Sequence, residues 1–124
     1  MLVVCDTTPI NYLVQIELID LIPRLYTNAC MPAAVLDELL HPLAPRVVRD
    51  WASGLPDWIA AKEPGIITDP ALLALHKGER EAIAPAGLLT ADFLLTDDYE
   101  ARITAQSRGL ATLTTLLILD AAAD

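Results

Sequence analysis

The chain has 124 residues, of which 54% are hydrophobic and 20% are charged, so its length fits one folded domain and its composition excludes a disordered chain. A formal net charge of −9 argues against nucleic-acid binding by charge alone, which relies on lysine and arginine, although bound cations would invert the sign locally. Because no apolar run is long enough to span a bilayer and no secretory signal is visible, we expect a soluble, cytoplasmic protein.

The first part of the chain reads as a strand followed by two helices. Residues 2–6 are apolar and β-branched, which favours a short strand that ends at an aspartate. Thr7 or Thr8, followed by a proline, supplies a hydroxyl cap and a first-turn proline for a helix over residues 10–16. Residues 18–25 predict a second helix, interrupted by a proline.

A second strand and two further helices follow. Residues 28–31 predict the strand, and Pro32 opens a helix in which Glu38 lies beside the apolar face rather than opposite it. That face consists of Val35, Leu36, Leu39 and Leu40. After a loop bracketed by prolines, residues 46–52 predict another amphipathic helix.

The middle of the chain predicts a third strand over residues 58–60 and a connection over residues 62–70 that contains proline and glycine. Residues 78–89 predict a helix whose early acids suit the helix dipole. Pro85 within this helix is expected to kink or shorten it.

Two strands and two helices complete the chain. Residues 93–96 predict a strand, residues 99–107 a helix closed by Gly109, and residues 110–113 a last strand before a terminal helix. Because strands alternate with helices, we predict a parallel sheet with right-handed crossovers and helices on both faces. The predicted fold class is α/β, a single three-layer α/β/α domain with a central parallel sheet over residues 1–124.

The cysteines and histidines give little sign of a site. Cys5 and Cys30 both lie in apolar, strand-like segments, so we predict buried, reduced thiols rather than a disulfide. Neither cysteine belongs to a C-x-x-C pair, and His41 and His76 lack a metal-ligand partner four residues on. The pattern therefore argues against a zinc site.

The acids that follow the apolar runs are the candidates for chemistry. Asp6 ends the first strand, and the pair Asp97 and Asp98 follows the apolar part of a later one. Three acids in predicted helices accompany them: Glu38, Glu79 and Glu81. Because ligands of an open parallel sheet bind outside the carboxyl ends of its strands, these acids can converge on one crevice. Converging carboxylates repel one another, and an oxygen-seeking cation such as Mg²⁺ supplies the counter-charge.

Each acid also has a plainer interpretation. Asp6 is equally suited to capping the next helix, and Asp98 is well placed to cap the helix that follows it. Glu38 alone is typical of a solvated helix acid, and Glu79 and Glu81 of first-turn acids that favour the helix dipole. The whole set is harder to explain in this way, because carboxylates gathered at one sheet edge suit the two-metal hydrolysis of phosphodiesters.

Four segments stand in order over nearly the whole chain: D-T-T-P-I-N-Y-L at 6–13, P-A-A-V-L-D-E-L at 32–39, G-E-R-E-A-I-A at 78–84 and L-L-T-D-D-Y-E-A-R at 94–102. Together they resemble the motifs of PIN-domain ribonucleases, within the VapC-like toxin branch. The resemblance implies a PIN-like fold and a Mg²⁺- or Mn²⁺-dependent endoribonuclease. Such proteins are commonly the toxin of a toxin–antitoxin pair, and they often form homodimers.

Carried over residue by residue, the resemblance implies a set of metal-holding catalytic acids: Asp6, Glu38, Glu79 or Glu81, and Asp98 with Asp97 beside it. Thr8 and Asn11 match the polar positions after the first acid, where they would hold a ligand water or orient that acid. Arg102 would either contact a substrate phosphate or form a salt bridge with an acid. Thr115 falls at the threonine position that the family has after its last strand.

The chain also departs from the family pattern. Both glycines that usually flank the threonine are replaced around Thr115, and Pro85 stands where a helix-compatible residue is usual. The chain ends soon after its final predicted helix begins, where relatives usually continue. These departures leave a second hypothesis open, in which a catalytically degenerate PIN scaffold acts as a binding or dimerisation module.

The leading hypothesis is an endoribonuclease toxin that hydrolyses RNA phosphodiesters by metal-activated water, leaving a 5′-phosphate and a 3′-hydroxyl. An antitoxin protein is expected to inhibit it by placing a basic side chain among the carboxylates. Apolar positions over residues 10–25 offer either a dimer face or ordinary core packing. An aspartyl-phosphate phosphatase is disfavoured because it needs Asp-x-Asp, and here the third position is Thr8. A phospho-receiver is disfavoured because it needs an acidic pair at the first strand end.

Overall fold

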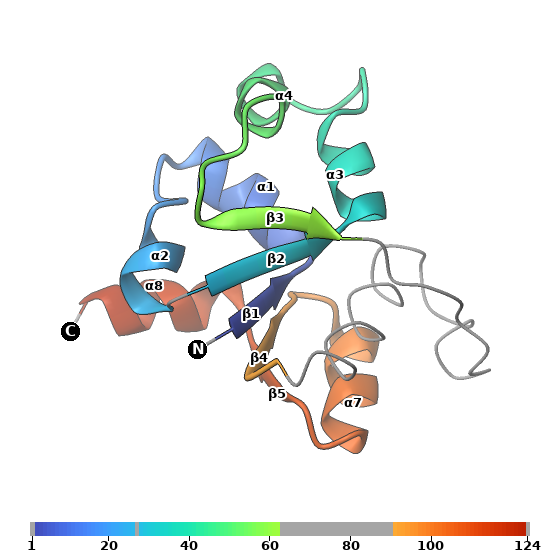
Figure 1. Ribbon diagram of the computed structural model, residues 1–124. Coiled ribbons are helices and arrows are strands. Elements are labelled where there is room, and N and C mark those ends of the chain that lie inside the picture. Colours follow the sequence, from blue (N-terminus) through green and yellow to red (C-terminus); the bar gives the residue numbers. More distant parts are fainter. Residues whose placement is uncertain (1, 27, 63–90, 124) are drawn as a thin grey trace.

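The computed structural model describes residues 2–26, 28–62 and 91–123, and Figure 1 shows how their elements are arranged. The strands are β1 (Leu2–Cys5), β2 (Asn28–Pro32), β3 (Ile59–Lys62), β4 (Phe93–Leu95) and β5 (Ala111–Leu113). The helices are α1 (Thr7–Gln15), α2 (Leu21–Leu25), α3 (Ala33–Leu39), α4 (Arg46–Ala52), α7 (Tyr99–Ser107) and α8 (Thr115–Ala123). Over these ranges, no helix has the length and apolar character needed to cross a membrane.

One stretch of the sequence analysis lies outside the described residues. It contains the helix predicted over residues 78–89, with Glu79, Glu81 and Pro85, and nearly all of the connection predicted over residues 62–70. The other predicted site residues lie within the described ranges.

The described strands form one sheet in the order β3-β2-β1-β4-β5, and every neighbouring pair is parallel, as predicted. Val4 of β1 lies opposite Cys30 of β2 and Leu94 of β4. β3 extends two residues beyond its predicted end, because its pairing with β2 continues until Lys62 lies opposite Pro32. The chain adds β2 and β3 on one side of β1, and then β4 and β5 on the other. The carboxyl ends of β1 and β4 thus form the switch point, where sheets of this kind bind ligands.

Alternate residues of the central strands face two separate cores. Val3 and Cys5 pack with apolar side chains of α1, α2, α3, α4 and α8. Val4 and Cys30 pack on the other face with Ala101 and its neighbours in α7. Helices therefore cover both faces, which confirms the three-layer α/β/α architecture (Figure 1). Both cysteines are buried and free, as predicted.

Helix boundaries differ from the predictions where the chain turns. α1 begins at Thr7, and its N-cap is Asp6 rather than a threonine, because the Asp6 carboxylate accepts a hydrogen bond from the Thr7 N–H. α2 begins only at Leu21, so Pro23 lies in its first turn, where a missing N–H breaks no helical hydrogen bond. Leu40 is the C-cap of α3 and is 40% exposed, so it does not belong to the buried face.

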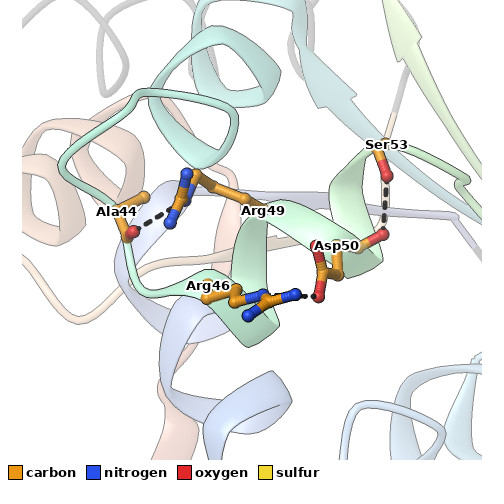
Figure 2. Close-up of polar contacts among 5 residues, drawn as sticks. All are labelled: Ala44, Arg46, Arg49, Asp50 and Ser53. Carbon is orange, nitrogen blue, oxygen red and sulfur yellow. Dashed lines mark hydrogen bonds and ion pairs between the residues drawn. The ribbon is translucent and has the colours of Figure 1, made fainter.

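α4 has polar contacts with the preceding loop and within its own length (Figure 2). The Nε of Arg49 donates to the carbonyl oxygen of Ala44 at 3.0 Å, and Ser53 Oγ donates to the carbonyl oxygen of Asp50 at 2.8 Å. Arg46 and Asp50 form an ion pair at 3.8 Å, with side chains 87% and 72% exposed. Exposed pairs of this kind add little stability, so substitutions of these two residues suit control variants.

α7 ends in a Schellman motif at a glycine. Gly109 has a φ of +78°, and its N–H donates to the carbonyl oxygen of Gln106 at 3.0 Å. The N–H of Leu110 reaches back to the carbonyl oxygen of Ala105 at 3.1 Å. The motif needs a left-handed residue, a conformation that glycine adopts at no steric cost, so the predicted closure at Gly109 is confirmed.

α1 ends in the same motif without a glycine. Glu17 has a φ of +62°, and its N–H donates to the carbonyl oxygen of Val14 at 3.1 Å. The N–H of Leu18 donates to the carbonyl oxygen of Leu13 at 2.8 Å. The β-carbon of Glu17 therefore sits in a backbone conformation that is strained for every residue except glycine.

Replacing Glu17 with glycine is expected to raise the free energy of unfolding by about 0.5–1 kcal/mol. The replacement removes the left-handed strain, and part of that gain is offset by the greater freedom of glycine in the unfolded chain. Urea unfolding measures the change. Glu17→Ala is the matched control, because it removes the same charge and keeps the β-carbon. Equal stabilisation by both variants would attribute the effect to charge and contradict the backbone explanation.

Candidate functional site

Asp6 is the buried carboxylate at the switch point. Its backbone N–H donates to the carbonyl oxygen of Leu95 at 2.9 Å, which continues the β1–β4 pairing by one residue and fixes where the side chain begins. Its Oδ1 accepts from the Thr7 N–H at 2.8 Å, and its Oδ2 accepts from Thr96 Oγ1 at 3.0 Å. The residue is 6% exposed. Asp6 therefore caps α1 and also presents a held carboxylate at the ends of two strands, so its two interpretations are compatible.

The negative charges of two other carboxylates affect the pKa of Asp6. Burial is the main cause that raises the pKa of Asp6, and the hydrogen bonds from Thr7 and Thr96 oppose it. The negative charges of Glu38 and Asp98 raise the pKa of Asp6 further. Of the predicted site residues that the structure describes, these three thus share one electrostatic environment, as the sequence analysis expected.

Glu38 reaches the site from α3. Its Oε2 accepts a hydrogen bond from Thr7 Oγ1 at 2.9 Å. Since the Thr7 N–H also binds Asp6, this one threonine connects the two carboxylates through its backbone and its side chain. Glu38 is half-buried, in agreement with its predicted place beside the apolar face of its helix.

Asp98 caps α7, as the sequence predicted. Its Oδ2 accepts from the Ala101 N–H at 2.8 Å. Its own N–H donates to Thr96 Oγ1 at 3.2 Å, so the same hydroxyl joins it to Asp6. A capping role thus does not move Asp98 away from the switch point.

Asp97 turns to a different partner. Its Oδ1 accepts from the Thr115 N–H at 2.8 Å, and its Oδ2 accepts from Thr115 Oγ1 at 2.6 Å. Both carboxylate oxygens therefore bind the first residue of α8 and attach that helix to the end of β4. Thr115, which falls at the family's threonine position, thus donates its hydroxyl to a carboxylate.

Thr7 and Thr96 are the residues that the sequence analysis missed. Thr96 is 1% exposed, and its hydroxyl donates to Asp6 while accepting from the Asp98 backbone. The available signal was position, because each threonine adjoins a candidate acid in the chain. A hydroxyl next to a buried carboxylate is a natural hydrogen-bond donor to that carboxylate or to a neighbouring one.

The polar positions Thr8 and Asn11 are arranged differently from Thr7. Thr8 is exposed on α1, and Asn11 Oδ1 accepts a hydrogen bond from Gln15 Nε2 one turn along the helix. The hydrogen bonds that orient the carboxylate of Asp6 come from Thr7 and Thr96. Arg102 lies on α7 and lines a cavity together with Thr115.

The side chains at the switch point offer carboxylate oxygens, the ligands that hard divalent cations prefer, and their negative charges repel one another. Within residues 2–26, 28–62 and 91–123, no three His, Cys, Asp or Glu side chains gather closely enough to hold a metal ion by themselves. Asp6, Glu38 and Asp98 would therefore need further ligands, such as the several waters that Mg²⁺ commonly keeps, and Glu79 and Glu81 stay predicted ligands.

Asp6→Asn is expected to stabilise the metal-free protein at pH 7. Because the pKa of Asp6 is raised in the folded state, ionisation of Asp6 lowers stability as the pH rises through that folded pKa. The stability difference between variant and wild type should therefore shrink as the pH falls toward 3.8, the ordinary pKa of the group. Urea unfolding in EDTA across this window measures it, with the exposed Asp50→Asn as control. A difference that stays constant with pH would contradict the raised pKa.

Thr115→Val is expected to lower the free energy of unfolding by about 1–2 kcal/mol, because it removes the hydrogen bond that the buried Thr115 hydroxyl donates to the exposed Asp97 carboxylate. Thr115→Ser keeps the hydroxyl and should lose less. Thermal and urea unfolding of both variants provide the measurement. If valine and serine cost the same, the hydroxyl contributes nothing and the Asp97–Thr115 contact is not what holds α8.

Comparison with known proteins agrees with this architecture. The sequence profile of a family described as PIN domain matches residues 2–124. A solved structure of a PilT N-terminus domain protein from the hyperthermophilic archaeon Sulfolobus solfataricus P2 is similar, with a TM-score of 0.67 and 14% identity over 98% of this chain and 92% of that chain. At this identity the likeness concerns the fold. No curated protein matches the sequence. Because the family profile covers nearly its whole length, the chain belongs to the PIN domain family.

Proposed function

We propose that this PIN domain is a Mg²⁺- or Mn²⁺-dependent endoribonuclease that acts in the cytoplasm as the toxin of a toxin–antitoxin pair. The observation that carries the proposal is the position of Asp6, a buried carboxylate at the switch point that Thr7 connects to Glu38 and Thr96 connects to Asp98. Negative charges gathered at one point repel one another and cost stability, so this arrangement favours a bound cation. PIN domains are typically metal-dependent nucleases, which supports the same conclusion.

The described residues have distinct parts in this proposal. Asp6, Glu38 and Asp98 would hold the metal together with Glu79 or Glu81. Thr7 and Thr96 keep the carboxylate of Asp6 in one orientation, because each donates to a different oxygen. A bound divalent cation lowers the pKa of water and offsets the charge of a phosphodiester. The expected products carry a 5′-phosphate and a 3′-hydroxyl.

The net charge of −9 is compatible with an RNA substrate when cations are bound at the acidic site. The acids of the site contribute to that charge, and cations bound there make the local field attractive to phosphate. An antitoxin that inserts a basic side chain among Asp6, Glu38 and Asp98 would compete with the metal and so inhibit. The two buried, reduced cysteines suit a reducing compartment such as the cytoplasm.

A homodimer is the assembly that we propose. Ile16 and Leu18, just after α1, are 37% and 40% exposed and so present apolar surface to water. They lie within residues 10–25, the segment that the sequence analysis put forward as a dimer face. Contact with a second copy would remove this apolar surface from water.

A second candidate is a scaffold without catalysis. It is favoured by the contact between Asp97 and Thr115, which satisfy each other rather than a substrate. Calorimetric titration with Mn²⁺ distinguishes the two candidates. Binding that Asp6→Asn abolishes supports the nuclease, whereas no binding at millimolar metal supports the scaffold.

Asp6→Asn is expected to lower RNA cleavage at least about 100-fold, since even the residues that merely support metal ligands contribute 10- to 100-fold. The assay follows a fluorescent single-stranded RNA in Mg²⁺ or Mn²⁺, with and without EDTA. The matched control is Asp50→Asn, the same change at an exposed ion pair on α4, which should cleave like the wild type.

Cleavage that survives Asp6→Asn would reject the assignment, because a contaminating nuclease or another site would then be responsible. The toxin role has its own readout with the same pair of variants. Induced expression of the wild type and of Asp50→Asn should arrest growth, and Asp6→Asn should not. Growth arrest by Asp6→Asn would separate toxicity from the carboxylate site.

A further inference from the structure

A cavity of ≈ 670 Å³ lies beside the switch point. Asp97, the neighbour of Asp98 in the chain, lines it together with Tyr12 of α1 and Arg102 of α7. The start of α8 supplies the remaining wall. A volume of this size is typical of pockets that bind small organic ligands. The cavity adjoins the carboxylate site through the segment that carries Asp97 and Asp98.

Arg102 lines this cavity and also carries a buried donor that no described residue satisfies. Its backbone N–H is used in the first turns of α7, where it donates to the carbonyl oxygen of Asp98 at 3.0 Å. Its side-chain Nε is buried and has no hydrogen-bond partner within the part of the chain that the structure describes. A buried donor without a partner is costly, more so when it belongs to a cation. A phosphate oxygen is the acceptor that a guanidinium binds best, often through two hydrogen bonds.

Large exposed side chains lie around the same cavity. Tyr12 is 50% exposed, Leu116 is 77% exposed and Leu117 is 48% exposed. An aromatic ring and two leucines at the rim of a concave site offer a surface on which a flat apolar group packs. Stacking of bases on aromatic side chains is the common means by which proteins hold single-stranded nucleic acid.

The carboxylate of Asp97 does not oppose an anion here as strongly as a free acid would. Both of its oxygens accept hydrogen bonds from Thr115. Thr115 is the first residue of α8, a nine-residue helix whose N-terminal dipole offsets negative charge nearby. The oxygens of the acid next to the cavity are therefore already hydrogen-bonded, whereas the Nε of Arg102 has no hydrogen-bond partner among the described residues.

We propose that this cavity binds one nucleotide of a single-stranded RNA next to the bond that is cut, with its phosphate on Arg102 and its base against Tyr12 and Leu116. The inference rests on the proposed function and extends it, because it assigns substrate-binding residues beyond the carboxylate site. It also gives a role to the exposed apolar side chains at the start of α8.

The test measures RNA affinity without cleavage. Fluorescence anisotropy follows a labelled twelve-nucleotide oligouridine binding to the full chain in the Asp6→Asn background. Adding Arg102→Gln should weaken binding about 10-fold and lower the slope of log K against log salt by about 0.7, the value for one phosphate contact on a single strand. Arg46→Gln removes the same charge from the exposed face of α4 and should leave both quantities unchanged.

The base contact is tested with a second pair of variants. Tyr12→Ala should weaken binding about 10-fold, within the range for loss of one stacked base, and Tyr12→Phe should retain it. Because Tyr12 is half exposed, neither variant is expected to unfold the chain. Equal effects of Arg102→Gln and Arg46→Gln, or variants of Arg102 and Tyr12 that alter only the unfolding free energy, would overturn the proposal.

The two hypotheses fail in different ways. If the wild type cleaves RNA and the Arg102 and Tyr12 variants bind RNA like their background, the cavity is not a nucleotide site and the nuclease assignment stands. If these variants weaken RNA binding and the wild type cleaves nothing in Mn²⁺, the cavity assignment stands and the nuclease assignment falls.

Discussion

The carboxylate of Asp6 connects the parts of this molecule that lie far apart in the chain. Its oxygens bind the start of α1 through the Thr7 N–H and the end of β4 through Thr96, and its own N–H continues the pairing of β1 with β4. Burial makes its negative charge costly, and two neighbouring acids add to that cost. This costly charge lies at the switch point between β1 and β4, where the order of the strands reverses. The metal-dependent chemistry that we propose would use this negative charge.

Asp97 and Asp98 are adjacent in the chain but bind different helices. Asp98 caps α7 and acts on Asp6, whereas Asp97 binds Thr115 at the start of α8. The two helices pack on opposite faces of the sheet, and successive side chains of an extended segment point in opposite directions. An acidic pair directly after a strand can therefore serve both faces at once. One residue remains available for the switch point because the other secures the neighbouring helix.

The sequence was sufficient for the architecture and for part of the site. Apolar runs that alternate with amphipathic segments predicted the parallel sheet, and the bounds of α4 and α7 matched the prediction. The convergence of Asp6, Glu38 and Asp98 followed from the general rule for strand ends. The contact of the Thr96 hydroxyl with Asp6 depends on the register between β1 and β4, and the contact of the Thr7 hydroxyl with Glu38 depends on how α1 packs against α3. No local pattern specifies either one, so both hydroxyls were missed. The Asp97–Thr115 contact likewise needs the register of β4 with β5, and the start of α2 depends on a turn that tertiary packing selects.

The placement of the two thiols disfavours a disulfide bond between them. Cys5 faces the side of the sheet with five helices and Cys30 faces α7, so the backbone of the sheet lies between them. Burial raises the pKa of both thiols, which keeps them protonated and poorly nucleophilic, although Lys62 partly offsets the shift at Cys30. A disulfide would require one strand to rotate by a residue, which would turn its whole apolar face outward. Because side chains alternate between the two faces of the sheet, the two thiols are kept apart although their strands are neighbours.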